Sequence, residues 1–326
     1  MNKENNPGTP LWRALLLEHR WPWRYIYNDL WPWVMQGIKL RFIDYILYRN
    51  INKFLLRLNS LSKYKKEDIT VIIGVKNIYD DRIINALKSI RNQDYPQNLI
   101  KITVVDYDSK KTLISKFKRV CKKYNAEYIR VNNQMVWSRS HCLNIGIKKA
   151  KTKYLLTSDV DIIFEKKYIS EAVKELRRNP YQIILSICLM LPNISINKLD
   201  FKKLKKIAKP RQGENVMTRK PLTDQEKIVA KGISLTLTKF YQDIGGYDEQ
   251  FRVCGFEDTD LMKRLMKYGL TIKDISSKTF YLHQWHPMYQ KIKKIKNYHK
   301  AIEKNLQYMR DNYSIIRNKD DWGEIR

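Results

Sequence analysis

Apolar, strand-like runs alternate with amphipathic, helix-like stretches from residue 69 to residue 161, and this alternation constrains the fold more than any other feature. Buried parallel strands are predicted at 69–75 (ITVIIGV), 100–109 (IKITVVDYDS), 126–131 (AEYIRV) and 153–161 (KYLLTSDVD). Helices are predicted from apolar residues at helical spacing over 80–93, 112–124 and 138–150. The pattern indicates an α/β fold, with an open, mostly parallel sheet and helices on both faces.

Two acidic clusters stand where predicted strands end. Asp106 and Asp108 close one strand, and Asp159 and Asp161 close another. Open α/β sheets bind their ligands beyond this edge. Because residues i and i+2 of an extended segment point the same way, the second pair can bind a hard cation that also holds phosphate groups, such as Mg²⁺ or Mn²⁺. By itself an Asp-x-Asp pair can equally be a solvated turn.

Residues 1–66 differ in composition from the rest of the chain. They hold five of the eight tryptophans, with WPW twice, and 12 Lys or Arg against 4 Asp or Glu. Trp, Tyr and Arg mixed with apolar residues are typical of a segment lying at the headgroup level of a membrane, and the charge favours an anionic surface. The alternative is a helical extension that packs its aromatics on the protein body or on a second subunit.

The net charge of +30, from 63 basic and 33 acidic residues, indicates an anionic partner: nucleic acid, phospholipid headgroups or a phosphorylated substrate. Part of the excess reflects a Lys-rich background. Four cysteines without CxxC spacing favour a reduced, cytoplasmic setting. The longest uncharged stretch, 179–197, holds two prolines and three asparagines, which fits a buried strand and exit loop better than a membrane span.

The second half of the chain contains another acidic cluster. A basic helix and a mobile loop are predicted over 198–231, and a helix that opens with Glu257, Asp258 and Asp260 closes on Gly269. At that helix start the macrodipole favours ionised carboxylates while their crowding opposes ionisation, so a moderate pKa is expected. The Lys-rich stretch from about residue 291 is expected to be a surface helix.

In chain order, the motifs ITVIIGV, VVDYDS, SRSHCLNIGIKKAKTKYLLTSDVDIIF, GGYDEQFRVCGFEDTDLMKRLMKYG and YLHQWHP resemble a GT-A-fold glycosyltransferase of the family 2 type. The second half is similar to the galactosyltransferase C-terminal region of family 7 enzymes and chondroitin-polymerase-like proteins. The resemblance covers roughly residues 68–290 and implies a Rossmann-like GT-A domain over 67–290. Its nucleotide-binding half is 67–165 and its acceptor and catalytic half is 166–290, with the segment 1–66 before it and a basic helical tail, 291–326, after it.

The resemblance also implies roles on the donor side. Asp106 matches the acid that hydrogen-bonds the uracil ring; the family more often reads VVDDGS, which puts the role of Asp108 in doubt. Asp161 matches the direct ligand of the Mn²⁺ or Mg²⁺ that bridges the nucleotide diphosphate, and Asp159 supports the ribose or the metal. The remaining matches are His283 as the residue that completes the metal site, His286 as a second candidate, and Arg139 and Asn144 as donor contacts.

On the acceptor side, Asp258 matches the catalytic base of inverting members, and Glu257 beside it holds the acceptor or tunes the base. Gly245 and Gly246 form a turn that commonly lines the acceptor site. Trp285 stacks on a sugar ring or simply fills space. Each of these residues also has a purely structural interpretation, as a helix N-terminal acid, a turn glycine or a packing aromatic.

The expected function is therefore metal-dependent, inverting transfer from a UDP-sugar to a glycan or lipid-linked glycan in surface polysaccharide synthesis. The protein would be cytoplasmic and peripheral at the inner face of the membrane. Such a transfer needs a Lewis acid for the leaving diphosphate and a base for the attacking hydroxyl.

Three other functions are less consistent with the sequence. A nucleotidyltransferase would carry a Gly-rich phosphate loop after ITVIIGV, which is missing here. A nucleic-acid-binding protein would show basic stripes with exposed aromatics, so nucleic acid is not the expected partner. A catalytically inactive scaffold would not need every expected catalytic acid, and all of them are present.

Overall fold

The computed structural model describes residues 66–132, 136–196, 198–210, 233–251, 255–287, 298–312 and 314–325. The Trp-rich segment predicted over 1–66 lies outside the described residues, apart from Lys66. So do residues 211–232, which make up most of the predicted mobile loop.

A seven-stranded sheet forms the centre of the molecule, in the order β10–β6–β9–β4–β1–β2–β3. Its strands are β1 (Ile69–Val75), β2 (Ile100–Tyr107), β3 (Glu127–Val131), β4 (Tyr154–Asp159), β6 (Gln182–Leu185), β9 (Ser234–Leu237) and β10 (Thr271–Asp274). All neighbours are parallel except β9, which runs antiparallel to both β4 and β6. The predicted α/β class with a mostly parallel sheet is confirmed.

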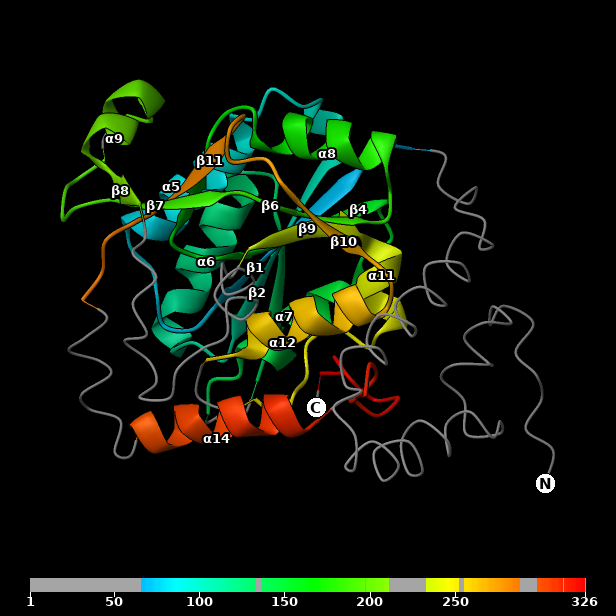
Figure 1. Cartoon of the computed structure of the whole chain (residues 1–326). Helices are drawn as coiled ribbons and strands as arrows, with labels where there is room; N and C mark the ends of the chain where they lie inside the picture. The colour runs from blue at the N-terminus through cyan, green and yellow to red at the C-terminus, as the bar shows by residue number, and fades with distance from the viewer. Residues whose placement is uncertain are drawn as a thin grey trace, which may run out of the picture.

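Helices cover both faces of this sheet (Figure 1). They are α5 (Asp81–Arg91), α6 (Lys111–Lys123), α7 (Arg139–Lys149), α8 (Tyr168–Arg178), α11 (Thr238–Asp243) and α12 (Glu257–Lys267), and a short 3₁₀ turn, η2 (Gln97–Leu99), precedes β2. Side chains fix the start of two of them: Asp80 accepts from the backbone N–H of Arg82, and Ser138 accepts from that of His141. In Figure 1, α8 lies on one face and α7 and α12 lie on the other.

A second, four-stranded sheet has the order β5–β11–β7–β8. Its strands are β5 (Ile162–Phe164), β7 (Ile187–Met190), β8 (Lys209–Pro210) and β11 (Phe280–His283). The stretch 179–197, predicted as one buried strand and its exit loop, is thus two strands, β6 and β7, in different sheets. Ser186 lies between them, fully buried, and its hydroxyl donates to the Thr279 carbonyl at 2.6 Å.

The C-terminal residues pack against the segment that contains Gly245 and Phe251. Helix α14 (Tyr298–Asp311) is helical as predicted, but it buries Leu306 and Met309 against Phe251. Further along, Asn318 donates to the carbonyl of Gly245 at 2.7 Å. The predicted surface helix thus packs one face on the body of the domain, and the residues after it also contact the domain.

Within the described ranges, none of the helices combines the length and apolar character that a bilayer crossing requires. Cys121, Cys142 and Cys188 are buried. Cys254, the fourth cysteine of the sequence, falls in the gap 252–254.

Candidate active site

The carboxyl ends of β1, β2 and β4 lie side by side at one edge of the large sheet. Val75 is in register with Asp106 on β2, and Gly74 is in register with Asp159 on β4. The two acidic clusters therefore flank the end of β1, as expected for the ligand-binding edge of an open α/β sheet.

Arg139 joins the Asp-x-Asp motif to the acidic start of α12. It is the first residue of α7, and its Nε donates to Asp159 Oδ1 at 2.6 Å while its Nη1 donates to Asp258 Oδ1 at 2.6 Å. The Tyr247 ring lies 5.4 Å from the guanidinium carbon, within cation–π range. Because two carboxylates and an aromatic face hold the guanidinium, Arg139 fixes the relative position of Asp159 and Asp258.

Asp258 has the electrostatic environment of a general base. Burial raises its pKa to about 7, Glu257 and Asp159 add to the rise, and Arg139 opposes it. Glu257 is 6% exposed, and its Oε2 has no hydrogen-bond partner in the part of the chain that the structure describes. A carboxylate that is half ionised near neutral pH can accept a proton from a substrate hydroxyl.

Asp161, His283 and His286 form a candidate metal centre. One ligand atom from each residue lies within 4.8 Å of the others, and Asp161 Oδ2 is 3.1 Å from His286 Nε2 and 3.7 Å from His283 Nε2. Asp161 is 8% exposed, yet its Oδ1 has no hydrogen-bond partner among the described residues. A buried carboxylate oxygen without a partner beside two imidazoles suits a divalent cation, so the donor set fits the ion that the sequence predicted.

The charge state of Asp161 also suits a cation. Burial alone would raise its pKa, but the nearby His286, His283 and Arg82 outweigh burial and hold the pKa below its usual value. Asp159, the other acid of the motif, is not part of this cluster; its side chain is 41% exposed and faces Arg139. Both predicted histidines thus join Asp161, whereas Asp159 lies on the Arg139 side.

Asp106 is fully buried at the end of β2 and both of its oxygens are bonded. Oδ1 accepts from the Ser109 backbone N–H at 2.9 Å, and Oδ2 accepts from Tyr128 Oη at 2.6 Å and Arg130 Nη1 at 2.8 Å. Asp108 is more open, with its side chain 29% exposed, and is 3.4 Å from Arg130 Nη2. Sequence reasoning missed Tyr128 and Arg130. Both lie in the predicted strand 126–131, which became β3, and β3 pairs with β2 so that Arg130 is in register with Asp106.

Asn144 has a different environment from the donor contact that the resemblance implied. It is fully buried, its Oδ1 accepts from the Tyr247 N–H at 2.8 Å, and its Nδ2 donates to the Tyr247 carbonyl at 2.8 Å and to Glu249 Oε1 at 2.9 Å. Its amide is committed to the 245–249 loop, so the structure makes it a support for that loop.

The two predicted acceptor glycines also face inward. Gly245 and Gly246 have φ of 72° and 68°, and a Cβ on Gly246 would lie 2.2 Å from Asn144 Oδ1. The nearest side chains around Gly245 belong to the C-terminal segment, and Trp322 is one of them. Trp285, in contrast, is 47% exposed and lines a cavity of about 270 Å³ beside His286.

The mostly parallel sheet, with acidic residues at its carboxyl edge and helices on both faces, is the architecture of a GT-A-fold glycosyltransferase. The chain belongs to the family described as Glycosyltransferase like family 2, which matches residues 70–324. No curated protein sequence matches the chain.

Solved structures agree on the fold. S. aureus TarS 1-349 is 16% identical with a TM-score of 0.50, covering 67% of this chain and 60% of that one. TarS 1-349 in complex with UDP-GlcNAc is 15% identical with a TM-score of 0.51, over 67% and 59% of the two chains. GalNAc-T7 with UDP, GalNAc and Mn²⁺ is 16% identical with a TM-score of 0.54, over 68% and 44%. The chain thus spans less than two thirds of each of these proteins.

Proposed function

We propose that the protein is a metal-dependent, inverting glycosyltransferase that moves a sugar from a UDP-sugar to a hydroxyl group of a glycan or lipid-linked glycan. The observation that carries the proposal is the pair of Arg139 contacts, which ties the Asp159 end of the Asp-x-Asp motif to the base candidate Asp258. The UDP-GlcNAc in TarS and the UDP and Mn²⁺ in GalNAc-T7 support the same class of donor and cofactor here.

Asp161, His283 and His286 would hold the divalent ion. One carboxylate and two imidazoles suit Mn²⁺ better than Mg²⁺, because Mg²⁺ prefers oxygen ligands. When bound, the ion supplies a Lewis acid for the leaving diphosphate. Asp159 and Arg139 lie on the other side of the motif, where they would face the ribose and the sugar of the donor.

Asp258 would act as the base. The acceptor oxygen forms a bond to the anomeric carbon, the bond from that carbon to the UDP oxygen breaks, and the hydroxyl proton passes to an Asp258 carboxylate oxygen. One base suffices for a single displacement, and a single displacement inverts the configuration of the sugar. Arg139 would keep Asp258 in place, and Glu257 would help to raise the pKa of the base.

The uracil would bind at the end of β2, against Asp106 and Asp108. Asp106 is fully buried and braced by Tyr128 and Arg130, so its carboxylate is held in one orientation. Asp106 would in turn hold the Arg130 guanidinium in place at this edge of the site. Because both of its oxygens already have partners, the more exposed Asp108 and the Arg130 guanidinium would share the contact with the base.

The acceptor would use the exposed face of Trp285, since a flat aromatic side chain stacks well on a sugar ring. We place the reaction in surface polysaccharide synthesis, at the inner face of the membrane. The Trp-rich, basic segment 1–66 is the feature of the sequence that supports a membrane setting.

A donor screen tests the proposal. UDP release is measured from a panel of UDP-sugars with Mn²⁺ or Mg²⁺, with and without EDTA, for wild type, Asp161→Asn and Asp258→Asn. An exposed acid remote in sequence from these motifs, changed in Asp94→Asn, is the matched control. We expect metal-dependent turnover of one or two donors, lost in the first two variants and kept in the control; the product's anomeric configuration, read by NMR, reports inversion. Equal turnover in EDTA and in Mn²⁺ would overturn the metal dependence.

A further inference from the structure

Helix α9 (Phe201–Ile207) carries a concentration of positive charge that the reaction does not use. Between residues 198 and 210 the chain has six lysines, one acid (Asp200) and no arginine. We call the six lysines the α9 basic face: Lys198, Lys202, Lys203, Lys205, Lys206 and Lys209. All six are exposed, and none forms an ion pair with another described residue.

The helix separates charge from apolar packing. At about 100° per residue, its four lysines fall within an arc of about 160°. Leu204 lies outside this arc and is 5% exposed, packed in the small apolar cluster over the second sheet. Ile207 lies at the border of the arc and is 40% exposed. The apolar side of α9 thus packs on the protein, and its charged side is exposed together with one isoleucine, although Lys205 Nζ also lies 5.0 Å from the centre of the Phe280 ring.

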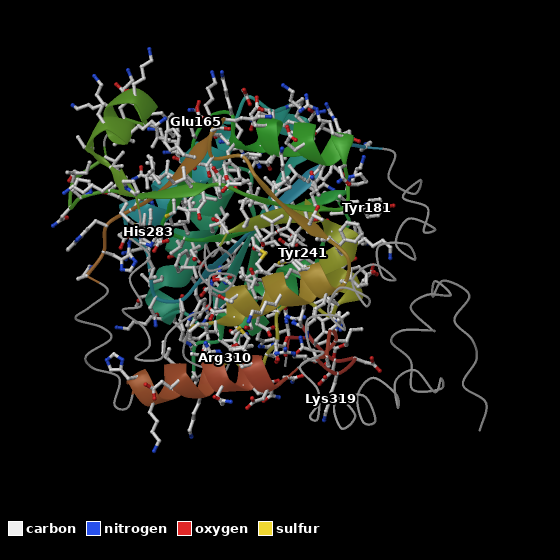
Figure 2. The ribbon with its side chains drawn as sticks, viewed as in Figure 1. Glu165, Tyr181, Tyr241, His283, Arg310 and Lys319 are labelled. Atoms are coloured by element: carbon white, nitrogen blue, oxygen red, sulfur yellow. The ribbon has the colours of Figure 1, made fainter. Side chains whose placement is uncertain are left out.

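The shape of the molecule presents this face. Figure 1 shows α9 standing out from the body of the protein next to β8. In Figure 2, nitrogen-tipped side chains extend outward from α9. Asp200 offsets only one of these six charges, and its carboxylate caps the helix by accepting from the backbone N–H of Lys203 at 3.1 Å.

The α9 basic face lies next to the candidate metal centre. Met190 on β7 pairs with His283 on β11 on one side and with Lys209 on β8 on the other. His283 and Lys209 are therefore two strands apart, about 10 Å across the sheet. Figure 2 labels His283 on the same side of the molecule as α9. A surface bound to α9 would lie on the same side of the molecule as His283 of the candidate metal centre.

We propose that the α9 basic face docks on an anionic phospholipid bilayer and turns the metal-centre side of the enzyme toward it. This inference rests on the proposed function for its purpose, because a lipid-linked acceptor is presented at that surface. Lysines are hydrated point charges that suit a diffuse layer of headgroup phosphates. Nucleic acid would be better matched by arginine and exposed aromatic side chains, and residues 198–210 contain no arginine, tryptophan or tyrosine.

The experiment measures vesicle co-sedimentation of the full chain. Vesicles are phosphatidylcholine alone or with about a third phosphatidylserine, at low salt and at about 0.15 M salt. The test variant is Lys202→Gln, Lys203→Gln and Lys206→Gln together. The matched control removes the same charge from α6, through Lys111→Gln, Lys118→Gln and Lys122→Gln; these three are also exposed and form no ion pair with described residues.

We expect wild type to bind only the phosphatidylserine vesicles, more weakly at the higher salt. The α9 variant should lose at least about tenfold in partition coefficient, and the α6 variant less than about twofold. Equal losses in both variants would overturn the proposal, since binding would then follow net charge. Wild-type binding by the α9 variant would overturn it too, and would assign the membrane contact to another segment.

Two further measurements distinguish membrane binding by the α9 basic face from nucleic-acid binding and from an effect on catalysis. An oligonucleotide that competes with the vesicles and binds tenfold more tightly to wild type than to the α9 variant would assign the face to nucleic acid and overturn the bilayer. UDP release with a soluble acceptor should be unchanged in both triple variants, because neither touches the catalytic residues. If no UDP-sugar is turned over at all, the proposed function is wrong. The vesicle experiment still decides whether the α9 basic face binds a bilayer, because it measures binding and not turnover.

Discussion

Arg139 Nη1 lies 2.6 Å from Asp258 Oδ1, and the Nε of the same guanidinium lies 2.6 Å from Asp159 Oδ1. One cation therefore partners carboxylates that are 99 positions apart in the sequence (258 − 159). Any change in the charge of Arg139 acts on both at once. The predictions for pH, for Arg139 and for stability follow from this shared contact.

Activity should rise with pH through neutrality. Asp258 must be ionised to accept a proton, and its pKa is about 7 because it is buried beside Glu257 and Asp159. We expect the acid limb of kcat/KM to have its midpoint near pH 7, with about a tenfold loss for each pH unit below it. Stopped-assay rates between pH 5 and pH 9 on one donor measure this. A flat profile across that range would contradict Asp258 as the base.

Replacing Arg139 should move the acid limb of the kcat/KM profile to higher pH. Arg139→Gln removes the group that lowers the pKa of Asp258, so ionisation of the base requires a higher pH. We expect lower activity at pH 7 and partial recovery at pH 9. Arg139→Lys keeps the charge but cannot contact both carboxylates in the same geometry, so it should shift the limb less. An acid limb at the same pH in Arg139→Gln and in wild type would contradict the claim that Arg139 lowers the pKa of the base.

Stability should show the opposite trend. The folded pKa of Asp258 lies above its unfolded value of 3.8, so the folded state holds the proton more tightly. The stability from this group is complete below about pH 4 and is lost as pH rises toward 7. Asp258→Asn lacks this ionisation, so its free energy of unfolding relative to wild type should rise between pH 5 and pH 8, by no more than about 3 kcal/mol. Urea melts at the two pH values measure the difference.

Metal affinity should depend on each member of the triad. Asp161→Asn, His283→Ala and His286→Ala each remove one of the three ligands, and each should weaken Mn²⁺ binding at least about tenfold. Titration of Mn²⁺ followed by electron paramagnetic resonance reads this without turnover. His299→Ala, which changes an exposed histidine on α14, is the matched control and should bind Mn²⁺ as wild type does.

The two adjacent glycines should respond differently to alanine. Both have positive φ, so each substitution costs about 1 kcal/mol in backbone strain. In Gly245→Ala the new methyl meets its nearest neighbours at 3.9 Å, whereas in Gly246→Ala it lies 2.2 Å from Asn144 Oδ1. We expect Gly246→Ala to lose at least about 2 kcal/mol more, through the displaced Asn144. Equal melting temperatures would contradict the packing described for Asn144.

Much of the fold was predictable because the signals are local. The run ITVIIGV is almost entirely apolar and forms β1, and the apolar residues YLL open β4. The start of α12 at Glu257 was also marked by its acids. The split of 179–197 into β6 and β7 was not predictable, because Ser186 marks the change of sheet only through a carbonyl on Thr279, distant in the sequence.

The candidate site was predictable in its residue types and less so in its pairings. Asp161, His283 and His286 were all anticipated, and they lie together. The Arg139–Asp258 contact was not anticipated, since nothing in the spacing of two residues that far apart indicates that they pair. The sequence does not reveal that Asn144 supports a loop, because a buried amide and a ligand-binding amide look identical in a sequence. Only the hydrogen bonds of Asn144 with Tyr247 distinguish the two.

Strand β9 has a consequence for how the protein is made. It fills the gap between β4 and β6, yet it follows both in the chain, at Ser234–Leu237. Until it emerges during synthesis, each of those strands has an unpaired edge that other nascent chains can join. Fragments that stop before residue 233 should therefore aggregate. The yield of intact enzyme in cells should depend on chaperones that bind the incomplete sheet before β9 is synthesised.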